Sequence, residues 1–573
     1  MTRIETYKKK SLGTKPIILG LLIAIILIVS SILLLLYPFA SKEKSIYFSG
    51  DYPILFEGKQ QGNAILVGKS VYVPISFMKK FIDDSIVYDV QSKSIIITTK
   101  DKVVQMPSKS LTYFINEKPV KLQVPPIQDK NGDIYVALDP ILNYYPIKYS
   151  ILSHSNAVQI QQNGDIIQTG TVINKDINEE KLRLRTKPDI QSPYTAQTKR
   201  EEKLYIEDEK EEYYYVRKAD GVAGYLKKDY IEGKHKNKIS VKHIQQKVEL
   251  KKINEPINLT WEAVYSLNPD TNQIPNMPGV NVVSPTWFKL ASKDGSIHNL
   301  GSTNYVKWAK KKGYQVWGLF SNAFDPELTH DAFQSFETRQ EMIRQLIMYS
   351  QMYRLNGINI DIENVNQEDG PYITQFVREA TPYFHEAGLT VSMDITFMAD
   401  GSNWSSFYER EKLAKTVDYL IVMAYDEHWG TSPVAGSVAS FPWVEENLNN
   451  LLKVVPNEKL ILGVPLYTRI WAEKDSGEVS SKAVSMEDVK KWLKDKKVKP
   501  KYDEASGQNY AEYYSKKEKT TYKIWLEDEF SLSKRAELAE KYDLVGIASW
   551  SRFFADDSAW TALNLSKKQM TKK

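Results

Sequence analysis

The sequence predicts a multidomain protein whose C-terminal part is a parallel (β/α)8 barrel, joined to an N-terminal membrane helix by two smaller β-rich domains. Three observations lead to this prediction. The chain has 573 residues, and a domain usually holds about 100 to 200 residues, so several domains are expected. One long apolar segment lies close to the N-terminus. From residue 258 onward, short apolar runs alternate with helical patterns, which is typical of repeated βα units.

The composition excludes several classes of protein. Lys plus Arg total 76 and Asp plus Glu total 71, so the net charge of +5 gives no strong positive field, and we expect no nucleic-acid partner. The chain contains no Cys, which excludes disulfides, thiol catalysis, iron–sulfur clusters and zinc sites built on thiolates. We expect neither a metal nor another cofactor.

The N-terminal segment predicts a single membrane anchor. Residues 17–36 are almost wholly aliphatic, and about 20 such residues in a helix match a hydrocarbon core of about 30 Å. We therefore expect a transmembrane helix over 16–40, after a basic cytoplasmic tail over 1–15, with the rest of the chain outside the cytoplasm. A cleaved signal peptide is the alternative, but its apolar region should be shorter and should end at a small-x-small site.

Residues 46–165 contain an internal duplication, which predicts two similar β-rich halves that pack on each other as a stalk. The runs Val71–Ile75 and Ile134–Leu138 superimpose at a shift of 63 residues, and each continues through a short helical pattern into alternating strands. The pattern resembles the copper amine oxidase N-terminal-like domain of bacterial surface proteins. Copper is not expected, because the segment has one His, His154, and no Cys.

Residues 166–232 predict a small β-barrel of short strands separated by turns. The run Tyr213–Tyr215 lies in a stretch of alternating charge, which favours a solvated hairpin with buried aromatic rings. The pattern resembles a bacterial Src-homology-3-type domain, and binding to the cell wall by this domain is a hypothesis. Residues 233–256 are rich in Lys and too polar to form a core, so we expect a linker.

The predicted barrel occupies residues 257–566. Its eight strand-like runs are 259–264, 280–285, 315–320, 357–363, 389–395, 419–425, 460–466 and 545–550. In this fold the active residues lie at the C-terminal ends of the strands, and about 250 residues normally suffice. The excess falls at about 474–530, between the seventh and eighth strands, where strand and turn signals predict an inserted α+β subdomain that walls the cleft.

The fourth predicted strand carries acids on its inner face. Side chains alternate along a strand, so the three Ile residues of 357–363 should face the helices, while Asn359, Asp361 and Glu363 face the interior. A polar row inside a barrel is costly unless it is hydrogen-bonded or functional. A buried network that only fixes the strand register is the alternative to an active site.

This strand resembles that of glycoside hydrolase family 18, the chitinase-like family, whose pattern is Asp-x-x-Asp-x-Asp-x-Glu. The chain keeps the last two acids and has Asn356 and Asn359 at the first two positions. Further matches follow in order along the chain: Met423–Asp426, Gly463–Tyr467 and Ser549–Trp550. With Asn as its middle residue, Gly357–Asp361 looks most like the branch of bacterial spore-cortex and cell-wall N-acetylglucosaminidases.

The resemblance implies retaining, substrate-assisted cleavage of a β-1,4 bond beside N-acetylglucosamine. Asp361 and Glu363 lie on one face of one strand, so neither is placed as the opposed nucleophile of an ordinary retaining glycosidase. In the family, Glu363 would protonate the glycosidic oxygen while the 2-acetamido carbonyl attacks the anomeric carbon and gives an oxazolinium ion. Asp361 would orient the acetamide, and Tyr425 would hydrogen-bond its oxygen.

The resemblance also implies substrate contacts. Asp426 would hold a sugar hydroxyl, and Trp550 would form the floor of the cleaved sugar's site by stacking. Trp287, at the end of the second strand, is a further stacking candidate, with core packing as the alternative for both rings. Arg469 would hold a sugar or lactyl carboxylate, unless it forms an ion pair with Glu473 or with Asp426.

Asn359 is the departure from the family pattern that bears most on the site. An amide cannot share a proton with Asp361 as a carboxyl would, so we expect Asn359 to orient Asp361 through a hydrogen bond.

The leading hypothesis is a membrane-tethered glycosidase that cuts N-acetylglucosaminyl bonds in peptidoglycan. Hydrolysis of chitin or chitooligosaccharides is the alternative among enzymes. A non-catalytic glycan-binding protein is the alternative from another class, and the retention of Glu363 speaks against it.

Overall fold

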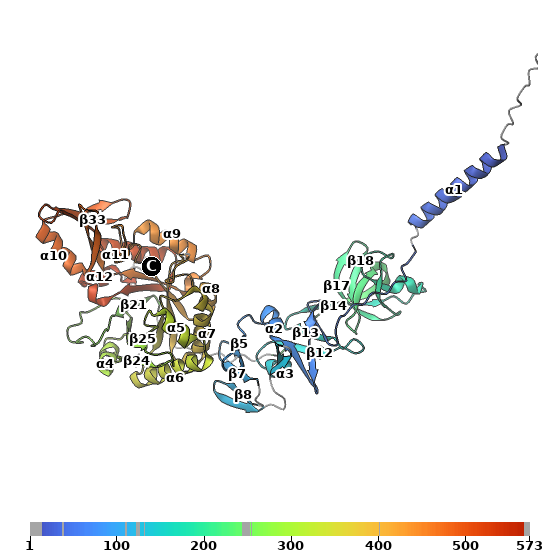
Figure 1. Cartoon of the computed structure of the whole chain (residues 1–573), viewed down its shortest axis with the longest axis horizontal. Helices are drawn as coiled ribbons and strands as arrows, with labels where there is room; N and C mark the ends of the chain where they lie inside the picture. The colour runs from blue at the N-terminus through green and yellow to red at the C-terminus, as the bar shows by residue number, and fades with distance from the viewer. Residues whose placement is uncertain are drawn as a thin grey trace, which may run out of the picture. The chain divides into compact units, whose positions relative to one another are not determined.

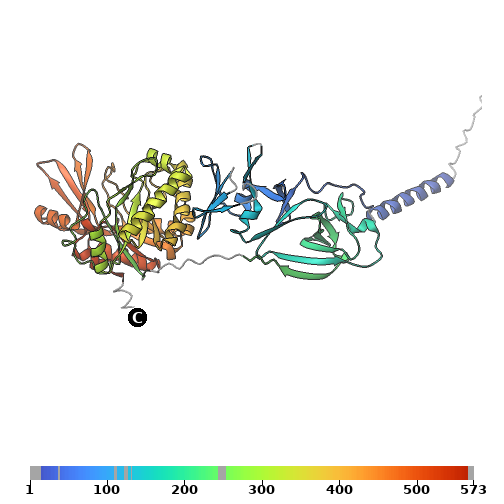
Figure 2. The ribbon, with the colours of Figure 1, turned by 90° about the horizontal axis from the view of Figure 1, so that it is seen from below.

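The computed structural model describes residues 14–36, 39–108, 112–121, 127–130, 132–242, 253, 255–399 and 401–565. The chain divides into two compact units (Figures 1 and 2). One unit holds residues 1–84 and 124–244, and the other holds 85–123 and 245–573. The predicted stalk domain of 46–165 is therefore divided between the two units.

The N-terminal apolar segment forms the helix α1, Thr14–Leu36. Figure 1 shows α1 as a single uninterrupted helix. Within the part of the chain that the structure describes, no helix has the length and apolar character needed to cross a membrane. Residues 1–13 of the predicted cytoplasmic tail lie outside the described residues.

The duplicated segments of the stalk pair with each other at a shared sheet. Strand β4 (Ser70–Pro74) runs antiparallel to β11 (Asp133–Ala137), and Val73 lies opposite Val136, its counterpart in the second copy. The sheet has the order β10-β11-β4-β3, and a second sheet has the order β12-β13-β1-β2. The remaining elements of these sheets and their helices are β1 (Pro53–Phe56), β2 (Lys59–Asn63), β3 (Ile65–Val67), α2 (Ile75–Phe81), β10 (Ile127–Lys130), α3 (Leu138–Ile141), β12 (Ile147–Ile151) and β13 (Val158–Gln162).

Residues 166–238 form one seven-stranded sheet with the order β16-β15-β19-β18-β17-β14-β20. Its elements are β14 (Ile166–Val172), η1 (Glu179–Leu182), β15 (Arg183–Arg185), β16 (Tyr194–Gln197), β17 (Lys203–Lys210), β18 (Tyr213–Arg217), β19 (Ala223–Lys227), η2 (Lys228–Tyr230) and β20 (Ile231–Lys238). The predicted linker start at 233 is wrong, because β20 continues to Lys238 through backbone pairing with β14 although its side chains are exposed. The Src-homology-3-type assignment stays a prediction.

Residues 85–123 supply a five-stranded sheet with the order β5-β6-β7-β8-β9. Its strands are β5 (Val87–Asp89), β6 (Ser94–Thr98), β7 (Val103–Pro107), β8 (Thr112–Ile115) and β9 (Lys118–Lys121). The sheet contacts the barrel helix α6 (Phe336–Tyr353), where the Phe336 N–H donates to Asp89 Oδ2 at 3.0 Å. Arg339 lies 3.6 Å from Asp89 and 2.9 Å from Glu379, and all three side chains are buried. Asp89 of β5 therefore caps α6, the helix that precedes the fourth barrel strand, although the two segments lie far apart in the sequence.

The predicted (β/α)8 barrel is confirmed. Its strands are β21 (Ile257–Glu262), β22 (Val282–Pro285), β25 (Gln315–Ser321), β26 (Gly357–Asp361), β27 (Thr390–Thr396), β28 (Tyr419–Met423), β29 (Leu460–Pro465) and β35 (Gly546–Trp550). Each pairs in parallel with its neighbours, and β21 closes the barrel by pairing with both β22 and β35. The other elements around it are β23 (Phe288–Leu290), β24 (Ile297–Asn299), α4 (Thr303–Lys311), α5 (Pro326–Phe333), η3 (Gln367–Asp369), α7 (Gly370–Glu386), α8 (Arg410–Thr416), α9 (Phe441–Leu451), η4 (Asn457–Lys459), α11 (Glu529–Lys541), η5 (Arg552–Phe554) and α12 (Asp557–Ala562).

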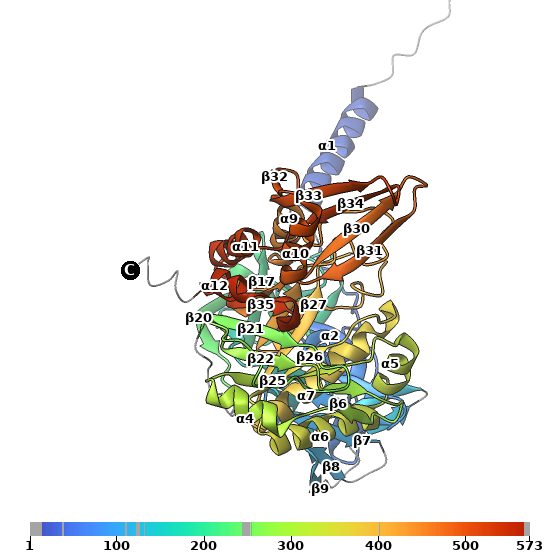
Figure 3. The same cartoon turned by 90° about the vertical axis from the view of Figure 1, so that its left-hand side faces the viewer.

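An α+β subdomain is inserted between β29 and β35, as predicted. It consists of β30 (Thr468–Lys474), β31 (Val479–Val484), α10 (Met486–Lys496), β32 (Lys501–Asp503), β33 (Gln508–Ser515) and β34 (Thr520–Trp525). Figure 3 shows its sheet, in orange and red, at one side of the barrel strands. The insertion starts at Thr468 rather than at 474, because β30 follows β29 almost directly and pairs with β31 and β34.

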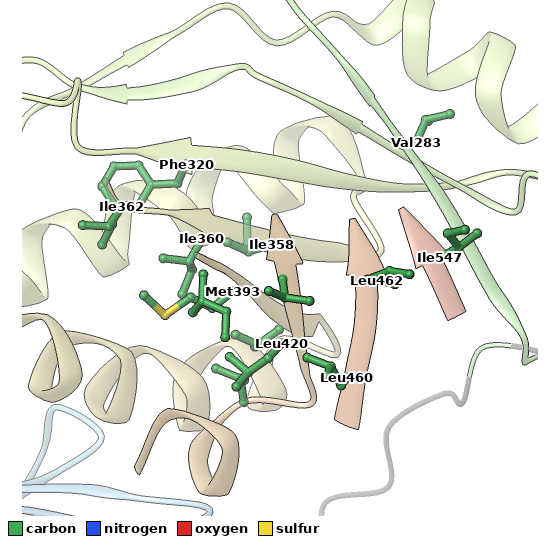
Figure 4. Packing of buried hydrophobic residues seen from close by; sticks show 14 of the residues in the cluster. Val283, Phe320, Ile358, Ile360, Ile362, Met393, Leu420, Leu460, Leu462 and Ile547 are labelled. Carbon is green, nitrogen blue, oxygen red and sulfur yellow. The ribbon is translucent and has the colours of Figure 1, made fainter. Parts of the chain in front are cut away.

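The alternation of side chains along β26 agrees with the sequence prediction. Ile358, Ile360 and Ile362 have no exposed surface and belong to the main hydrophobic core. Figure 4 shows them on the helix side of the strands, with Phe320 and Met393 from neighbouring strands. The polar residues between them therefore face the interior of the barrel.

Candidate active site

Glu363 is held in place by the side chain of Asn322, which follows β25. The Glu363 N–H donates to Asn322 Oδ1 at 3.0 Å, and Asn322 Nδ2 donates to the Glu363 carbonyl at 2.7 Å. Asn322 is fully buried, and Nδ2 also donates to Thr329 Oγ1 at 2.9 Å. The Asn322 side chain therefore links the chain after β25 to the backbone after β26, beyond the point where the two strands stop pairing. The sequence analysis missed Asn322, whose signal was a polar residue directly after an apolar strand.

The two acids of the motif have raised pKa values. Asp361 is buried, and burial raises its pKa to about 7. Glu363 is half-buried; burial raises its pKa well above the ordinary value, and the negative charges of Asp361, Asp394 and Asp426 raise it further. A carboxyl that keeps its proton near neutral pH can act as a general acid. The electrostatics of this site therefore suit Glu363 as a proton donor.

Asn359 forms four hydrogen bonds inside the barrel. Its Oδ1 accepts from Trp261 Nε1 at 2.9 Å and from Ser284 Oγ at 3.1 Å. Its Nδ2 donates to Ser392 Oγ at 3.1 Å and to Asp394 Oδ1 at 2.8 Å. An amide NH2 group has two donors, and both are used here. The expected hydrogen bond from Asn359 to Asp361 is therefore wrong, because the acceptors on the neighbouring strand β27 take both N–H groups.

Asp394 is a further acid beside the motif that the sequence analysis did not identify. It lies on β27 and has 1% of its surface exposed. Burial and the charge of Asp361 raise its pKa, against the lowering effect of hydrogen bonds from Asn359 and Trp261. Its signal was a single acid on the inward-facing positions of an apolar strand. No group of three or more His, Asp or Glu residues in the described part of the chain is arranged to hold a metal ion.

Tyr425 and Asp426 follow β28, at the same end of the barrel as Glu363. Tyr425 is half-buried, and its pKa is raised by burial and then by the charge of Asp394. Asp426 has a φ of 61°, and its Oδ1 accepts a hydrogen bond from Tyr467 Oη at 2.5 Å. The tyrosine hydroxyl is thus neutral and able to donate a hydrogen bond, and Asp426 is fixed by a neighbouring phenol.

Arg469 forms the ion pair with Asp426 that was one of its predicted alternatives. The distance from Nη2 to Asp426 Oδ1 is 3.6 Å, and the guanidinium lies over the Tyr467 ring at 5.6 Å. Glu473, the other predicted partner, instead pairs with Lys523 at 2.6 Å. The structure thus brings Arg469 to the wall of the site beside Asp426.

The two tryptophans proposed to stack on sugar lie in different environments. Trp550 ends β35, is half-buried, and has its ring centroid 5.9 Å from that of Trp261, edge to face. Trp287 has no exposed surface, packs against Tyr305, and donates from Nε1 to Asn268 at 2.7 Å. A buried ring has no face to offer a sugar. The prediction that Trp287 binds substrate is therefore wrong, and Trp550 remains the candidate.

Further aromatic rings are exposed on the loops at the C-terminal ends of the barrel strands. They are Phe324 (42% exposed), Trp404 (48%), Trp429 (53%) and Phe553 (70%). The rings of Phe324 and Trp404 lie 6.3 Å apart, although they come from loops after different strands. Exposed rings on the face that carries the acids offer flat apolar surfaces to sugar rings.

The family comparison agrees with this geometry. Residues 285–555 match the model for glycosyl hydrolases family 18. The barrel is a family 18 glycoside hydrolase domain. Residues 57–189 match the copper amine oxidase N-terminal domain, a span that starts and ends later than the predicted 46–165.

Curated relatives of this family 18 domain include several glycosidases. The chain is 29% identical over 300 residues to the uncharacterized glycosylase YvbX of Bacillus subtilis (strain 168), which covers 50% of this chain and 85% of the relative. It is 23% identical over 256 residues to the cortical fragment-lytic enzyme of the same organism, covering 44% of this chain and 58% of that enzyme. It is 26% identical over 239 residues to di-N-acetylchitobiase of Rattus norvegicus, covering 37% and 65%.

Proposed function

We propose that this family 18 glycosidase cleaves β-1,4 bonds next to N-acetylglucosamine in peptidoglycan by a retaining, substrate-assisted mechanism. The observation that carries the proposal is the position of Asp361 and Glu363, which lie together at the C-terminal end of β26, where burial raises the pKa of both carboxyls. Asp426, the acid across the site, is already bonded to Tyr467 and Arg469. Because these contacts occupy Asp426, we assign the role of nucleophile to the substrate's own acetamide.

In the proposed reaction Glu363 gives its proton to the glycosidic oxygen. The acetamide carbonyl oxygen attacks the anomeric carbon as the bond to the leaving sugar breaks, and water later opens the oxazolinium ion with retention. Asp361 accepts the acetamide N–H and stabilises the positive charge that develops. Tyr425, whose hydroxyl is neutral, donates a hydrogen bond to the acetamide oxygen. Trp550 stacks under the cleaved sugar.

Peptidoglycan is favoured over chitin as the substrate by two observations. The Asn in the motif Gly357–Asp361 matches the cell-wall branch, and the curated relatives include a cortical fragment-lytic enzyme. Chitooligosaccharide hydrolysis is the second candidate, because di-N-acetylchitobiase is also among the relatives.

We also propose that the N-terminal segment 16–40 anchors the enzyme in the cell membrane with the barrel outside the cytoplasm; this proposal rests on the sequence, since no helix of the described residues meets the length and apolar character of a membrane span. The support is the sequence, with an aliphatic run over 17–36 after a basic segment. Full-length protein should then fractionate with membranes, and external protease should reach the barrel in intact cells. Recovery of a soluble form starting near Ser41 would show that the segment is cleaved.

The test of the function compares wild type with Glu363→Gln on purified peptidoglycan and on chitin, with mass analysis of the new reducing ends. The amide keeps the shape of the side chain but cannot donate the proton, so we expect a loss of about 100- to 10,000-fold or more. Binding of the glycan should be retained. Glu478→Gln, an exposed glutamate of the insertion that pairs with Lys474, is the matched control and should have wild-type activity. Wild-type turnover by Glu363→Gln would disprove the assignment.

A further inference from the structure

Two acids lie side by side on neighbouring barrel strands. Strands β26 and β27 run parallel, with Asn359 opposite Ser392 and Ile360 opposite Met393. Ile360 and Met393 both belong to the hydrophobic core on the helix side. The next residue on each strand, Asp361 and Asp394, therefore points into the barrel beside the other.

Both carboxyls are removed from water. Asp394 has 1% of its surface exposed and Asp361 has 6%. Asp394 Oδ1 accepts a hydrogen bond from Asn359 Nδ2 at 2.8 Å. Within the described residues, Asp361 Oδ1 is buried and has no hydrogen-bond partner. Two buried carboxylates at neighbouring positions cannot both ionise cheaply, so such a pair normally holds one proton between them.

The groups around this pair are mainly acids and phenols. Besides Asp361, the residues that interact electrostatically across the site are Glu363 from the end of β26, Tyr408 from the loop before α8, and Tyr425 and Asp426 from the end of β28. Arg410 lies against the Tyr408 ring at 5.3 Å and donates its hydrogen bonds to backbone carbonyls and Ser405. The surroundings therefore favour the protonated form of at least one carboxyl.

We propose that Asp394 is a positioning residue that shares one proton with Asp361, and so supplies from β27 the carboxyl that family 18 enzymes carry at the position of Asn359. This inference rests on the proposed function. Asn359 fits the arrangement because its Nδ2 donates to Asp394 Oδ1 at 2.8 Å and so holds this carboxyl, which lies on the neighbouring strand β27.

The shared proton keeps the charge of the pair constant during the reaction. When Asp361 accepts the acetamide N–H, its own O–H bond breaks and an O–H bond forms on Asp394. The pair holds one proton and one negative charge before and after this transfer. The negative charge beside Glu363 also keeps that acid protonated until it donates to the leaving sugar.

The test uses Asp394→Asn and the exchange variant Asn359→Asp with Asp394→Asn. The single variant removes the proton-sharing carboxyl, and we expect kcat at pH 7 to fall about 10- to 100-fold, less than the loss of the proton donor itself. The alkaline limb of the kcat profile should move to lower pH, because the variant pair can carry at most one negative charge beside Glu363, whereas the wild-type pair carries two once it loses its shared proton at alkaline pH. The exchange variant again has one acid and one amide at positions 359 and 394, but with the two residues in each other's place. It should recover most of the rate and return the alkaline limb toward the wild-type pH.

Each outcome decides the inference. A single variant with wild-type kcat and an unmoved pH profile would overturn it. A single variant that is slow but has the wild-type pH profile, and is not rescued by the exchange, would show that Asp394 only supports the fold. Melting temperatures show whether Asp394→Asn folds. If it does not, the activity and pH profile of the exchange variant decide whether the inference holds. Lack of hydrolysis by wild type itself would refute the proposed function instead.

Discussion

Replacing Asn322 with Ala tests how the proton donor is positioned. Asn322 makes two hydrogen bonds to the backbone of Glu363, at 3.0 and 2.7 Å, and one to Thr329. Alanine removes these three and also the 3.3 Å hydrogen bond from the Phe324 N–H to Asn322 Oδ1, and it leaves the backbone groups of Glu363 without this partner. The residue does not contact substrate in the proposed reaction, so its effect must pass through the position of Glu363.

The expected size of the effect follows from the hydrogen bonds lost. A net hydrogen bond contributes about 0.5–1.5 kcal/mol, and leaving a buried polar group unpaired costs about 1–3 kcal/mol. Two backbone groups are affected and Glu363 is only half-buried, so we expect the free energy of unfolding to fall by about 2–4 kcal/mol. A displaced proton donor should lower kcat by about 100-fold, with KM nearly unchanged.

Chemical denaturation and steady-state hydrolysis of the acetylated glycan measure both effects. Asn364→Gly is the matched control, because Asn364 follows Glu363, makes one hydrogen bond to Phe324 at 2.8 Å, and has a φ of 53° that Gly tolerates. This control should lose less stability and keep most of kcat. If Asn322→Ala behaves like the control in both assays, the reasoning about Glu363 is refuted.

Two further predictions concern stability. Burial raises the pKa of Asp361 in the folded protein from 3.8 to about 7, so its contribution to the free energy of unfolding is complete below pH 3.8 and declines as pH rises toward 7. Urea unfolding of Asp361→Asn at a series of pH values should show a smaller decline than wild type. The same decline in both proteins would contradict this prediction. Asp89→Ala removes the cap of α6 and a partner of buried Arg339, so the free energy of unfolding of the barrel should fall by about 1–2 kcal/mol. Glu117→Ala breaks only the half-exposed pair with Arg344 and should change stability little, and equal losses would contradict the capping role.

The sequence predicts most of the barrel because its strands carry a strong local signal. The alternation of Ile358, Ile360 and Ile362 with polar residues determines which face of β26 carries the acids, and the structure agrees. The motif likewise places Glu363 and Tyr425 at the C-terminal ends of their strands. These features depend on a strand's own residues, so one sequence suffices.

The parts that the sequence did not predict depend on contacts between distant segments. Asn322 and Asp394 acquire their roles only when β25 and β27 pair with β26 on either side. Trp287 looked like a cleft residue because it follows a strand, but Tyr305 of α4 covers it. The stalk segment is divided because residues 85–123 belong to the same unit as the barrel, and Asp89 of this segment contacts α6, which lies far away in the sequence.

The most direct test of the account compares wild-type hydrolysis of one peptidoglycan preparation before and after chemical de-N-acetylation, with mass analysis of the products. The mechanism needs the acetamide as nucleophile, and an oriented internal nucleophile lowers the barrier by several kcal/mol, up to about 7–11 kcal/mol in the best cases. We predict rapid release of fragments ending in N-acetylglucosamine from the acetylated glycan, and only trace cleavage of the de-N-acetylated one. Equal rates on both would contradict substrate assistance by Asp361 and Glu363, even though the barrel fold would stand.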